Sequence, residues 1–199
     1  MTALGLLERG IAAMALVVLS PVLVLIALAV RATSSGPVVF RQLRVGRGGA
    51  LFEIYKFRTM VQHADRIAAN VSPSGDPRVT AVGRVLRAMY LDELPQLVNV
   101  VKGTMDLVGP RPETPEFVAL YDAEELRVLD VRPGLVGPST LAFMDEASRL
   151  ASVHDSEAYY RETMLHERAR LDLGYLDRRS VAGDIDLLVR QLVAILRLG

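Results

Sequence analysis

The pattern of apolar and polar residues divides this 199-residue chain into an apolar N-terminal segment and a polar body. No residue between Gly10 and Val30 is charged, and Arg9 and Arg31 stand at the two ends of this run. As one straight helix the run would be about 31 Å long, which is close to the thickness of the hydrocarbon core of a bilayer. The pattern therefore predicts a membrane-associated helix near the N-terminus.

Ser20 and Pro21 lie in the middle of this apolar run. Proline lacks the N–H that would bond to the carbonyl of Val17, and its ring crowds that carbonyl, so the helix is expected to break here. Each half would then be about 15 Å long, half of the hydrocarbon thickness. Two such halves predict a re-entrant helix–break–helix hairpin, which enters and leaves the membrane by its positive, cytoplasmic face.

Two other interpretations of the apolar run remain open on hydropathy alone. A kinked helix that crosses the membrane completely satisfies the same pattern. A cleaved signal peptide is the other, because Ala27-Leu28-Ala29 imitates a cleavage site. Against it, Glu8 offsets Arg9 and the run exceeds the usual ~7–15 residues of a signal sequence.

The body begins with a segment typical of a β-hairpin. Two β-prone runs, residues 38–45 and 51–57, flank the turn sequence Gly46-Arg47-Gly48-Gly49. The segment has one acid, Glu53, and five cations: Arg41, Arg44, Arg47, Lys56 and Arg58. A solvated sheet edge and a patch for lipid headgroups or a phosphorylated substrate both fit this charge.

Helical patterns follow the hairpin. Residues 81–91 predict an amphipathic helix that places Arg84 and Arg87 three positions apart, hence on one face. Residues 184–199 fit either a core helix or a helix lying in the membrane interface. We therefore expect a mainly helical α+β fold with a small β-hairpin and amphipathic helices, divided into a re-entrant membrane segment, 1–31, and a cytosolic domain, 32–199.

Charge and cysteine content narrow the classes of function. The chain has 23 Lys and Arg against 23 Asp and Glu, so its net charge gives no indication of binding to nucleic acid. It has no cysteine, which excludes disulfides and Cys-ligated zinc. Contact with a phosphorylated molecule must therefore come from a local group of basic residues.

Such a group surrounds an acidic pair within residues 90–112. Asp92 and Glu93 are adjacent, Arg87 lies upstream, and Arg111 lies between two prolines downstream. Arginines bind phosphate oxygens, one carboxylate can attack phosphorus, and another can hold a divalent cation. The pattern indicates a phosphoryl site. In the alternative, Asp92 caps a helix and Glu93 complements the helix dipole.

Five motifs in order resemble a known family: "SSGPVVFRQLRVG", "YKFRTM", "DPRVTAVGRVLR", "LDELPQLVNVVKG" and "LVGPRP". From Gly5 to about Pro138 the chain resembles the bacterial sugar transferases called monotopic phosphoglycosyl transferases, which include the catalytic half of undecaprenyl-phosphate galactose phosphotransferases. The resemblance implies transfer of a sugar 1-phosphate from a nucleotide diphosphate sugar, expected to be a UDP-sugar, to polyprenyl (undecaprenyl) phosphate. UMP is released, and the product begins the assembly of a bacterial glycan such as an exopolysaccharide.

The same resemblance implies roles for single residues. Asp92 matches the nucleophile that forms a covalent aspartyl phosphosugar, and Glu93 matches the partner acid associated with Mg²⁺. Ser20 and Pro21 match the break of a re-entrant helix at the cytoplasmic face of the inner membrane. Phosphate-binding roles are expected for Arg87 and Arg111 and, within matching motifs, for Lys56 and Arg84.

At two places the sequence departs from the family pattern, and this limits which roles can be assigned from the resemblance. The familiar "GDMSLVGPRP" reads "GTMDLVGPRP" here, so Thr104 replaces an acid, for which Asp106 is a candidate substitute. After "RPGL", the text "VGPSTLAFMDEA" replaces "TGxAQVNGR", and we therefore infer no particular sugar.

The expected partners are a nucleotide diphosphate sugar, polyprenyl phosphate and membrane lipid, with no nucleic acid. A second copy of the chain and downstream glycosyltransferases are further partners to test. The alternative function is a non-catalytic membrane scaffold that recruits later glycosyltransferases, with the acidic pair only capping a helix.

Overall fold

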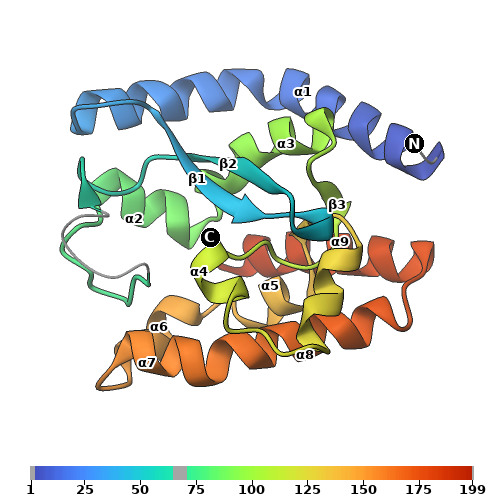
Figure 1. Ribbon diagram of the computed structural model, residues 1–199. Coiled ribbons are helices and arrows are strands. Elements are labelled where there is room, and N and C mark those ends of the chain that lie inside the picture. Colours follow the sequence, from blue (N-terminus) through green and yellow to red (C-terminus); the bar gives the residue numbers. More distant parts are fainter. Residues whose placement is uncertain (1–2, 65–70, 199) are drawn as a thin grey trace.

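A long apolar helix, α1 (Ala3–Thr33), lies along one side of a set of short strands and helices (Figure 1). The computed structural model describes residues 3–64 and 71–198. Its fold is mainly helical with two small sheets, which agrees with the expected α+β class.

The predicted hairpin is confirmed. Strands β1 (Val39–Val45) and β2 (Leu51–Phe57) pair antiparallel, with the first residue of β1 opposite the last residue of β2. A short 3-10 turn, η1 (Arg47–Gly49), joins them. Gly48 has a φ of 64°, a left-handed conformation that glycine adopts without the strain that a side chain would cause.

The rest of the body is built from short helices around a second sheet. Strands β3 (Asp106–Val108) and β4 (Gly134–Val136) of this sheet pair in parallel. The helical elements are α2 (Ala81–Ala88), η3 (Leu91–Gln96), α3 (Leu97–Lys102), α4 (Pro115–Val118), η4 (Glu125–Asp130), α5 (Pro138–Ala142), α6 (Glu146–Ala151), α7 (Ser156–Tyr159), η5 (Tyr160–Met164), α8 (Leu165–Leu176) and α9 (Val181–Leu198).

Helix α1 differs from the expected hairpin of two half-helices. It is continuous from Ala3 to Thr33, with Pro21 inside it, so this structure does not confirm the re-entrant break. The Ser20 hydroxyl donates to the carbonyl of Val17 at 2.7 Å and satisfies the oxygen that Pro21 cannot bond. Contacts with the body on both sides of Pro21 also hold the two halves in line.

Both halves of α1 pack against the body. Ala12 is fully buried in a cluster with residues of β2, α3 and β3, and Val30 is buried in a second cluster with Phe57 and Leu86. The opposite face of α1 exposes many large apolar side chains, among them Met14, Val17, Val18, Val24, Leu25 and Leu28. Among the described residues, α1 is the one helix long and apolar enough to cross a membrane.

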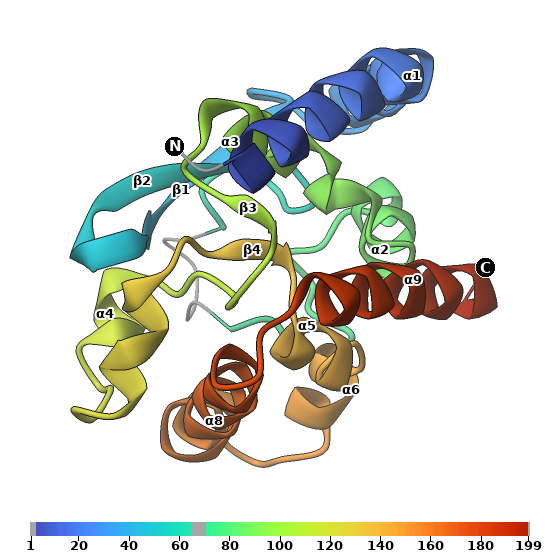
Figure 2. The ribbon, with the colours of Figure 1, turned by 90° about the vertical axis from the view of Figure 1, so that its right-hand side faces the viewer.

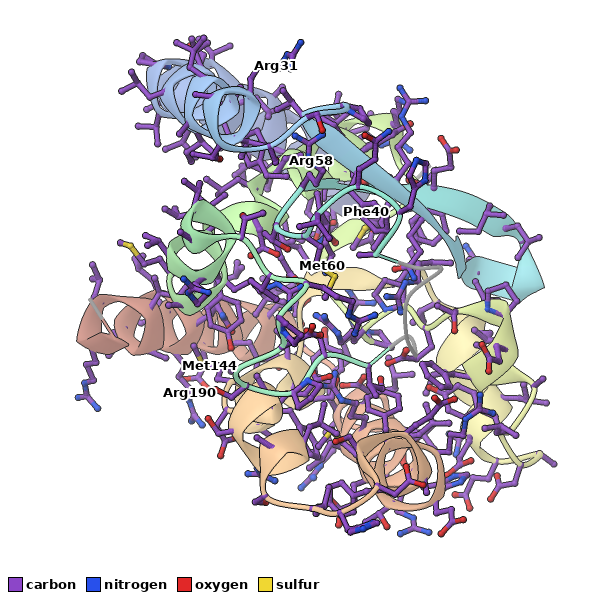
Figure 3. All side chains as sticks on the ribbon, turned by 90° about the vertical axis from the view of Figure 1, so that its left-hand side faces the viewer. Arg31, Phe40, Arg58, Met60, Met144 and Arg190 are labelled. Atoms are coloured by element: carbon purple, nitrogen blue, oxygen red, sulfur yellow. The ribbon has the colours of Figure 1, made fainter. Side chains whose placement is uncertain are left out.

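Helix α9 packs partly against the core, as one of its two sequence alternatives predicts. Leu187 and Leu188 pack against the core, whereas a separate stripe along the helix is exposed. This stripe comprises Val181, Ile185, Val189, Leu192, Val193 and Leu196. Figures 2 and 3 show α1, α2 and α9 on one side of the molecule, with Arg31 at the end of α1 and Arg190 on α9.

Asn99 of α3 joins this helix to the free side of the hairpin. Its side chain donates to the carbonyl of Glu53 at 2.6 Å and accepts from the backbone N–H of Tyr55 at 3.2 Å. Asn99 is 1% exposed, so it satisfies two β2 backbone groups that would otherwise be buried without partners.

We expect Asn99→Ala to destabilise the fold by about 2–4 kcal/mol, because both backbone groups of β2 lose their partner. For a chain of this length the midpoint of thermal unfolding should fall by roughly 5–15 °C. Thermal unfolding in detergent measures the effect, with the exposed Gln62→Ala as control. Equal midpoints for the two variants would contradict the assigned role of Asn99.

Candidate active site

The acidic pair lies directly after a sharp turn at the end of α2. Tyr90 makes this turn in the left-handed conformation (φ 55°, ψ 18°), which is uncommon for a residue with a side chain. Its hydroxyl donates to the carbonyl of Met144 at 2.7 Å and fixes the turn. Asp92 and Glu93 then fall inside η3, where no side chain caps the helix. The capping alternative for Asp92 is therefore wrong.

Glu93 is held by two cations that come from distant parts of the chain. Its Oε1 accepts from Lys56 Nζ at 2.7 Å and from Arg111 Nη2 at 3.3 Å. Burial by itself would raise the pKa of Glu93, but Lys56 and Arg111 outweigh it and hold this pKa well below its usual range. Glu93 is therefore a fixed negative charge at the centre of the site.

Asp92 has a different environment from its neighbour. The residue is 9% exposed, and no side chain among the described residues donates a hydrogen bond to its carboxylate. Burial and the adjacent Glu93 charge raise the pKa of Asp92, against the opposing effects of Lys56 and Arg87. A desolvated carboxylate that no described side chain binds as a donor keeps lone pairs available for attack, and this fits a nucleophile better than a structural ion.

Arg87 is positioned close to Asp92 by the packing of α2. Its Nε donates to Thr59 Oγ1 at 2.9 Å and its Nη1 donates to Ser72 Oγ at 2.8 Å. The helix can approach this closely because Gly83 has no side chain; a Cβ there would lie 2.0 Å from the carbonyl oxygen of Thr59. Arg84 is exposed on the same helix and contacts the carbonyl of Val79 but neither acid.

The loop that presents Arg111 is fixed by Asp172 of α8. The Asp172 carboxylate accepts from the backbone N–H of Arg111 at 3.1 Å, and from the backbone and hydroxyl of Ser139 at 3.1 and 2.8 Å. Burial raises the pKa of Asp172 to about 6, although these hydrogen bonds oppose the shift. Sequence reasoning missed this residue, because nothing in the "LDLGY" text links it to a loop 61 residues away.

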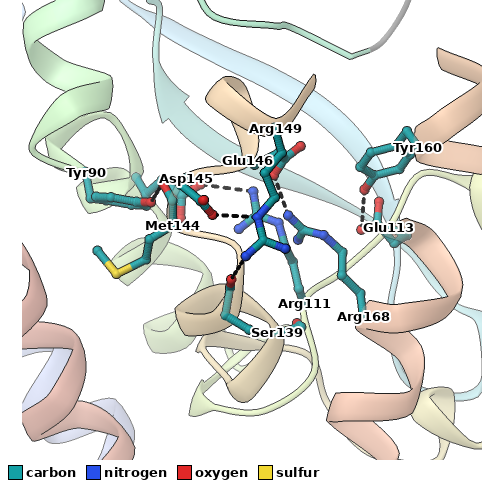
Figure 4. A network of polar contacts seen from close by, with 12 residues as sticks. Tyr90, Arg111, Glu113, Ser139, Met144, Asp145, Glu146, Arg149, Tyr160 and Arg168 are labelled. Carbon is teal, nitrogen blue, oxygen red and sulfur yellow. Dashed lines mark hydrogen bonds and ion pairs between the residues drawn. The ribbon is translucent and has the colours of Figure 1, made fainter. Parts of the chain in front are cut away.

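A second buried network lies on the other side of Arg111 (Figure 4). Glu113 accepts from the hydroxyl of Tyr160 at 2.8 Å and from Arg44 at 3.1 Å, and Arg168 donates to Glu146. Sequence reasoning had included Arg44 among the cations of the hairpin but missed the other residues of this network. Glu113 directly follows the "GPRP" motif, and this position could have indicated it.

The cations of the hairpin do not form one patch. Lys56 reaches the acidic pair, whereas Arg44 binds Glu113 and Arg58 binds Ser34 and Pro37 beneath the end of α1. Asp106, the candidate substitute for a missing acid, forms an ion pair with Arg132 at 2.9 Å. The structure thus brings together Asp92, Glu93, Lys56, Arg87 and Arg111, and leaves Arg84 and Asp106 outside this group.

The residues at this site fit a magnesium ion in part. Both cations bind Oε1 of Glu93, and no described residue donates a hydrogen bond to its Oε2. Mg²⁺ in phosphoryl-transfer sites is commonly held by one or two carboxylates, with water and substrate phosphates completing the shell. No cluster of three or more metal-binding side chains occurs within residues 3–64 and 71–198. Any ion here would therefore depend on the substrate.

One family of known proteins matches almost the whole chain. The family model for bacterial sugar transferases matches residues 3–198. The chain is 45% identical over 138 residues to the UDP-N-acetylgalactosamine-undecaprenyl-phosphate N-acetylgalactosaminephosphotransferase of Aeromonas hydrophila, covering 66% of the chain and 33% of that protein.

Two glucose-1-phosphate transferases align with a larger share of the chain than the Aeromonas hydrophila protein does. The UDP-glucose:undecaprenyl-phosphate glucose-1-phosphate transferase of Caulobacter vibrioides is 36% identical over 93% of the chain and 66% of its own length. The Escherichia coli protein of the same name is 37% identical over 89% of the chain and 36% of its own length. The chain thus spans from one third to just under two thirds of the length of these relatives.

Proposed function

Because the chain belongs to the bacterial sugar transferase family, we propose that it transfers a sugar 1-phosphate from a UDP-sugar to undecaprenyl phosphate. The observation that carries this proposal is the contrast within the acidic pair. Glu93 is bound by Lys56 and Arg111, whereas the buried carboxylate of Asp92 receives no side-chain donor among the described residues. The names of the relatives support the two substrates.

The proposed reaction has two displacements at the same phosphorus. An Asp92 carboxylate oxygen attacks the phosphorus that bears the sugar, the bond from this phosphorus to the UMP oxygen breaks, and UMP leaves. An oxygen of the lipid phosphate then attacks the aspartyl phosphosugar, which frees Asp92 and forms a sugar diphospholipid. Arg87 and Arg111 hold the phosphate oxygens, and Lys56 fixes Glu93. Mg²⁺ would neutralise charge on the diphosphate of the donor and so favour the departure of UMP.

A screen of UDP-sugars tests the proposal directly. The full chain in detergent or nanodiscs is mixed with undecaprenyl phosphate, Mg²⁺ and one UDP-sugar at a time, and UMP release is measured. We expect at least one donor to give lipid-dependent turnover. No turnover with any donor would reject the enzyme assignment and favour the scaffold that recruits later glycosyltransferases.

The charges in the site predict a pH dependence. We expect UMP release to fall as the pH drops through the pKa of Asp92, which lies above its ordinary 3.8, because only the ionised carboxylate attacks. Glu93 stays ionised, since its pKa is lowered. Glu93→Gln removes the negative neighbour of Asp92, so the acid limb should move to lower pH even though the maximal rate falls. Initial rates of UMP release against pH measure the acid limb of the native protein and of Glu93→Gln. If the limb lies at the same pH in both, the charge of Glu93 does not act on Asp92.

We further propose that the protein is monotopic at the cytoplasmic face of the inner membrane, with α1 bending at Ser20-Pro21 when it enters lipid. Two observations support this placement. Both halves of α1 rest on the same body, and its opposite face is apolar and exposed. The exposed stripe of α9 on the same side would add a second lipid contact.

Introduced cysteines can report this topology, because the chain has none of its own. We expect Thr2→Cys and Ser35→Cys both to be shielded from a membrane-impermeant maleimide in intact spheroplasts and labelled after lysis. Combining Thr2→Cys with Ser20→Ala and Pro21→Leu should expose residue 2 to the outside, since a regular apolar helix can then cross. External labelling of Thr2→Cys without these changes would instead support the alternative in which α1 crosses the membrane completely.

A further inference from the structure

A cavity of about 50 Å³ adjoins Arg111 on the side of the buried Glu113–Tyr160 network (Figure 4). Its wall includes Arg44, Thr114 and Glu146. Glu113 in the same wall is already engaged, because one of its carboxylate oxygens binds Tyr160 and the other binds Arg44. This carboxylate therefore serves as a fixed part of the wall.

Other polar groups of the wall have no partner. Thr114 is 7% exposed, and its Oγ1 finds no hydrogen-bond partner among the described residues. Although Thr114 precedes the first residue of α4, its hydroxyl does not cap that helix. Arg44 Nε is likewise buried without a partner in the described part of the chain. Buried polar groups are nearly always paired in folded proteins, so these two indicate a place for a polar ligand.

Arg168 adds a third unsatisfied group behind Glu146. The residue is 3% exposed and donates through Nη2 to Glu146, while its Nε and Nη1 have no partner among the described residues. Figure 4 shows the guanidinium groups of Arg111 and Arg168 close to Glu146. The region therefore offers both spare donors, from arginine and threonine, and a spare acceptor, from the carboxylate of Glu146.

This combination identifies the class of ligand. A hydroxyl group both donates and accepts, so sugar hydroxyls can satisfy Glu146, Thr114 and Arg44 together. An ionised phosphate has no proton to give to Glu146, so it would leave this acceptor without a donor. We propose that this cavity receives the hydroxyl groups on one edge of the donor's sugar ring. The proposal rests on the transferase function proposed above.

The position and size of the cavity support this assignment. The sugar is bonded to the phosphate that Asp92 is proposed to attack, and Arg111 reaches from the cavity wall to Glu93, the neighbour of Asp92. The uracil base is separated from that phosphorus by a further phosphate and the ribose. A volume of about 50 Å³ admits a few water-sized groups but not a whole hexose. The cavity would therefore select sugars by the substituents at one or two ring carbons.

The test compares the sugar preference of matched variants. Thr114→Val keeps the shape of the side chain and removes its hydroxyl. For each variant, kcat/KM for UMP release is measured with UDP-glucose, UDP-galactose and their two N-acetylamino counterparts. Thr114→Val should lower the preference for the best donor over its epimer or N-acetyl counterpart by about three- to tenfold, with no change in inhibition by UMP. Thr114→Ser, which restores the hydroxyl, should recover the native ratio.

Thr140→Val is the matched control, because Thr140 is also buried, its hydroxyl has no partner within residues 3–64 and 71–198, and it does not line the cavity. If Thr114→Val is too unstable to assay, Glu146→Gln should change the same ratio. Unchanged ratios, within about twofold, or an equal change in Thr140→Val would overturn the sugar subsite. Failure of the native chain to release UMP from any donor would instead reject the transferase function on which the subsite rests.

Discussion

Replacing Asp92 with asparagine is expected to leave a folded protein whose turnover falls by at least roughly a thousandfold, because an amide cannot act as the nucleophile. The native carboxylate is buried, and its pKa is raised, which means that its ionised form at neutral pH destabilises the fold. The Asp92→Asn variant carries a neutral side chain of nearly equal size, so it should unfold at the same temperature as the native protein or at a higher one. If Asp92 had only a structural role, the Asp92→Asn variant would show the opposite result: it would lose stability and retain turnover.

A covalent adduct provides a second measurement of the role of Asp92. With a UDP-sugar and no lipid acceptor, the native protein should release up to one equivalent of UMP and gain the mass of a sugar phosphate. Peptide mapping should place this mass on the peptide that contains Asp92, and the Asp92→Asn variant should lack it. If UMP appears only after lipid is added and no adduct can be trapped, the double displacement is wrong, whereas the membrane placement is unaffected.

The parts of the fold that were predicted correctly depend on local sequence. The turn glycines after Val45 fix the hairpin. The apolar period of residues 81–91 gives α2, but this helix ends at Ala88, because Tyr90 turns the chain in a left-handed conformation. The acidic pair was selected from the sequence because arginines flank it and its motif resembles that of a known family. Lys56 was placed in the candidate site by its motif alone, since its partner Glu93 is 37 residues away and packing brings the two together.

The parts that could not be predicted depend on tertiary contacts. The rule that proline breaks a helix is local, whereas the continuity of α1 in this structure depends on the Ser20 hydroxyl and on packing on both sides of Pro21. The support of Arg111 by Asp172 joins a loop to α8 across 61 residues. The pairing of Glu146 with Arg168 lies in the segment that departs from the family text, where no motif indicated a role.

The second large effect is expected for Arg111. Lysine at this position keeps the positive charge but loses the planar fork that binds two phosphate oxygens at once. The change would also weaken the support of Glu93, because Arg111 Nη2 and Lys56 Nζ both donate to its Oε1 in the native protein. We expect kcat/KM for UMP release to fall by about 10- to 200-fold in Arg111→Lys, which corresponds to the loss of a charge-assisted hydrogen bond. Arg87→Lys should show a loss of the same order, since its guanidinium also bridges Thr59 and Ser72.

The control is Arg127→Lys, because Arg127 is about half exposed and pairs with Asp177 and Glu124 on the surface. Surface pairs of this kind contribute little, so its kinetics should stay within about twofold of the native values. The backbone N–H of Arg111 binds Asp172, and this bond survives the change to lysine, so the loop and the thermal midpoint should be preserved. A kinetic loss without a stability loss therefore assigns the guanidinium to substrate phosphate. Native kinetics in both Arg111→Lys and Arg87→Lys would contradict the phosphate-binding role proposed for these two guanidinium groups.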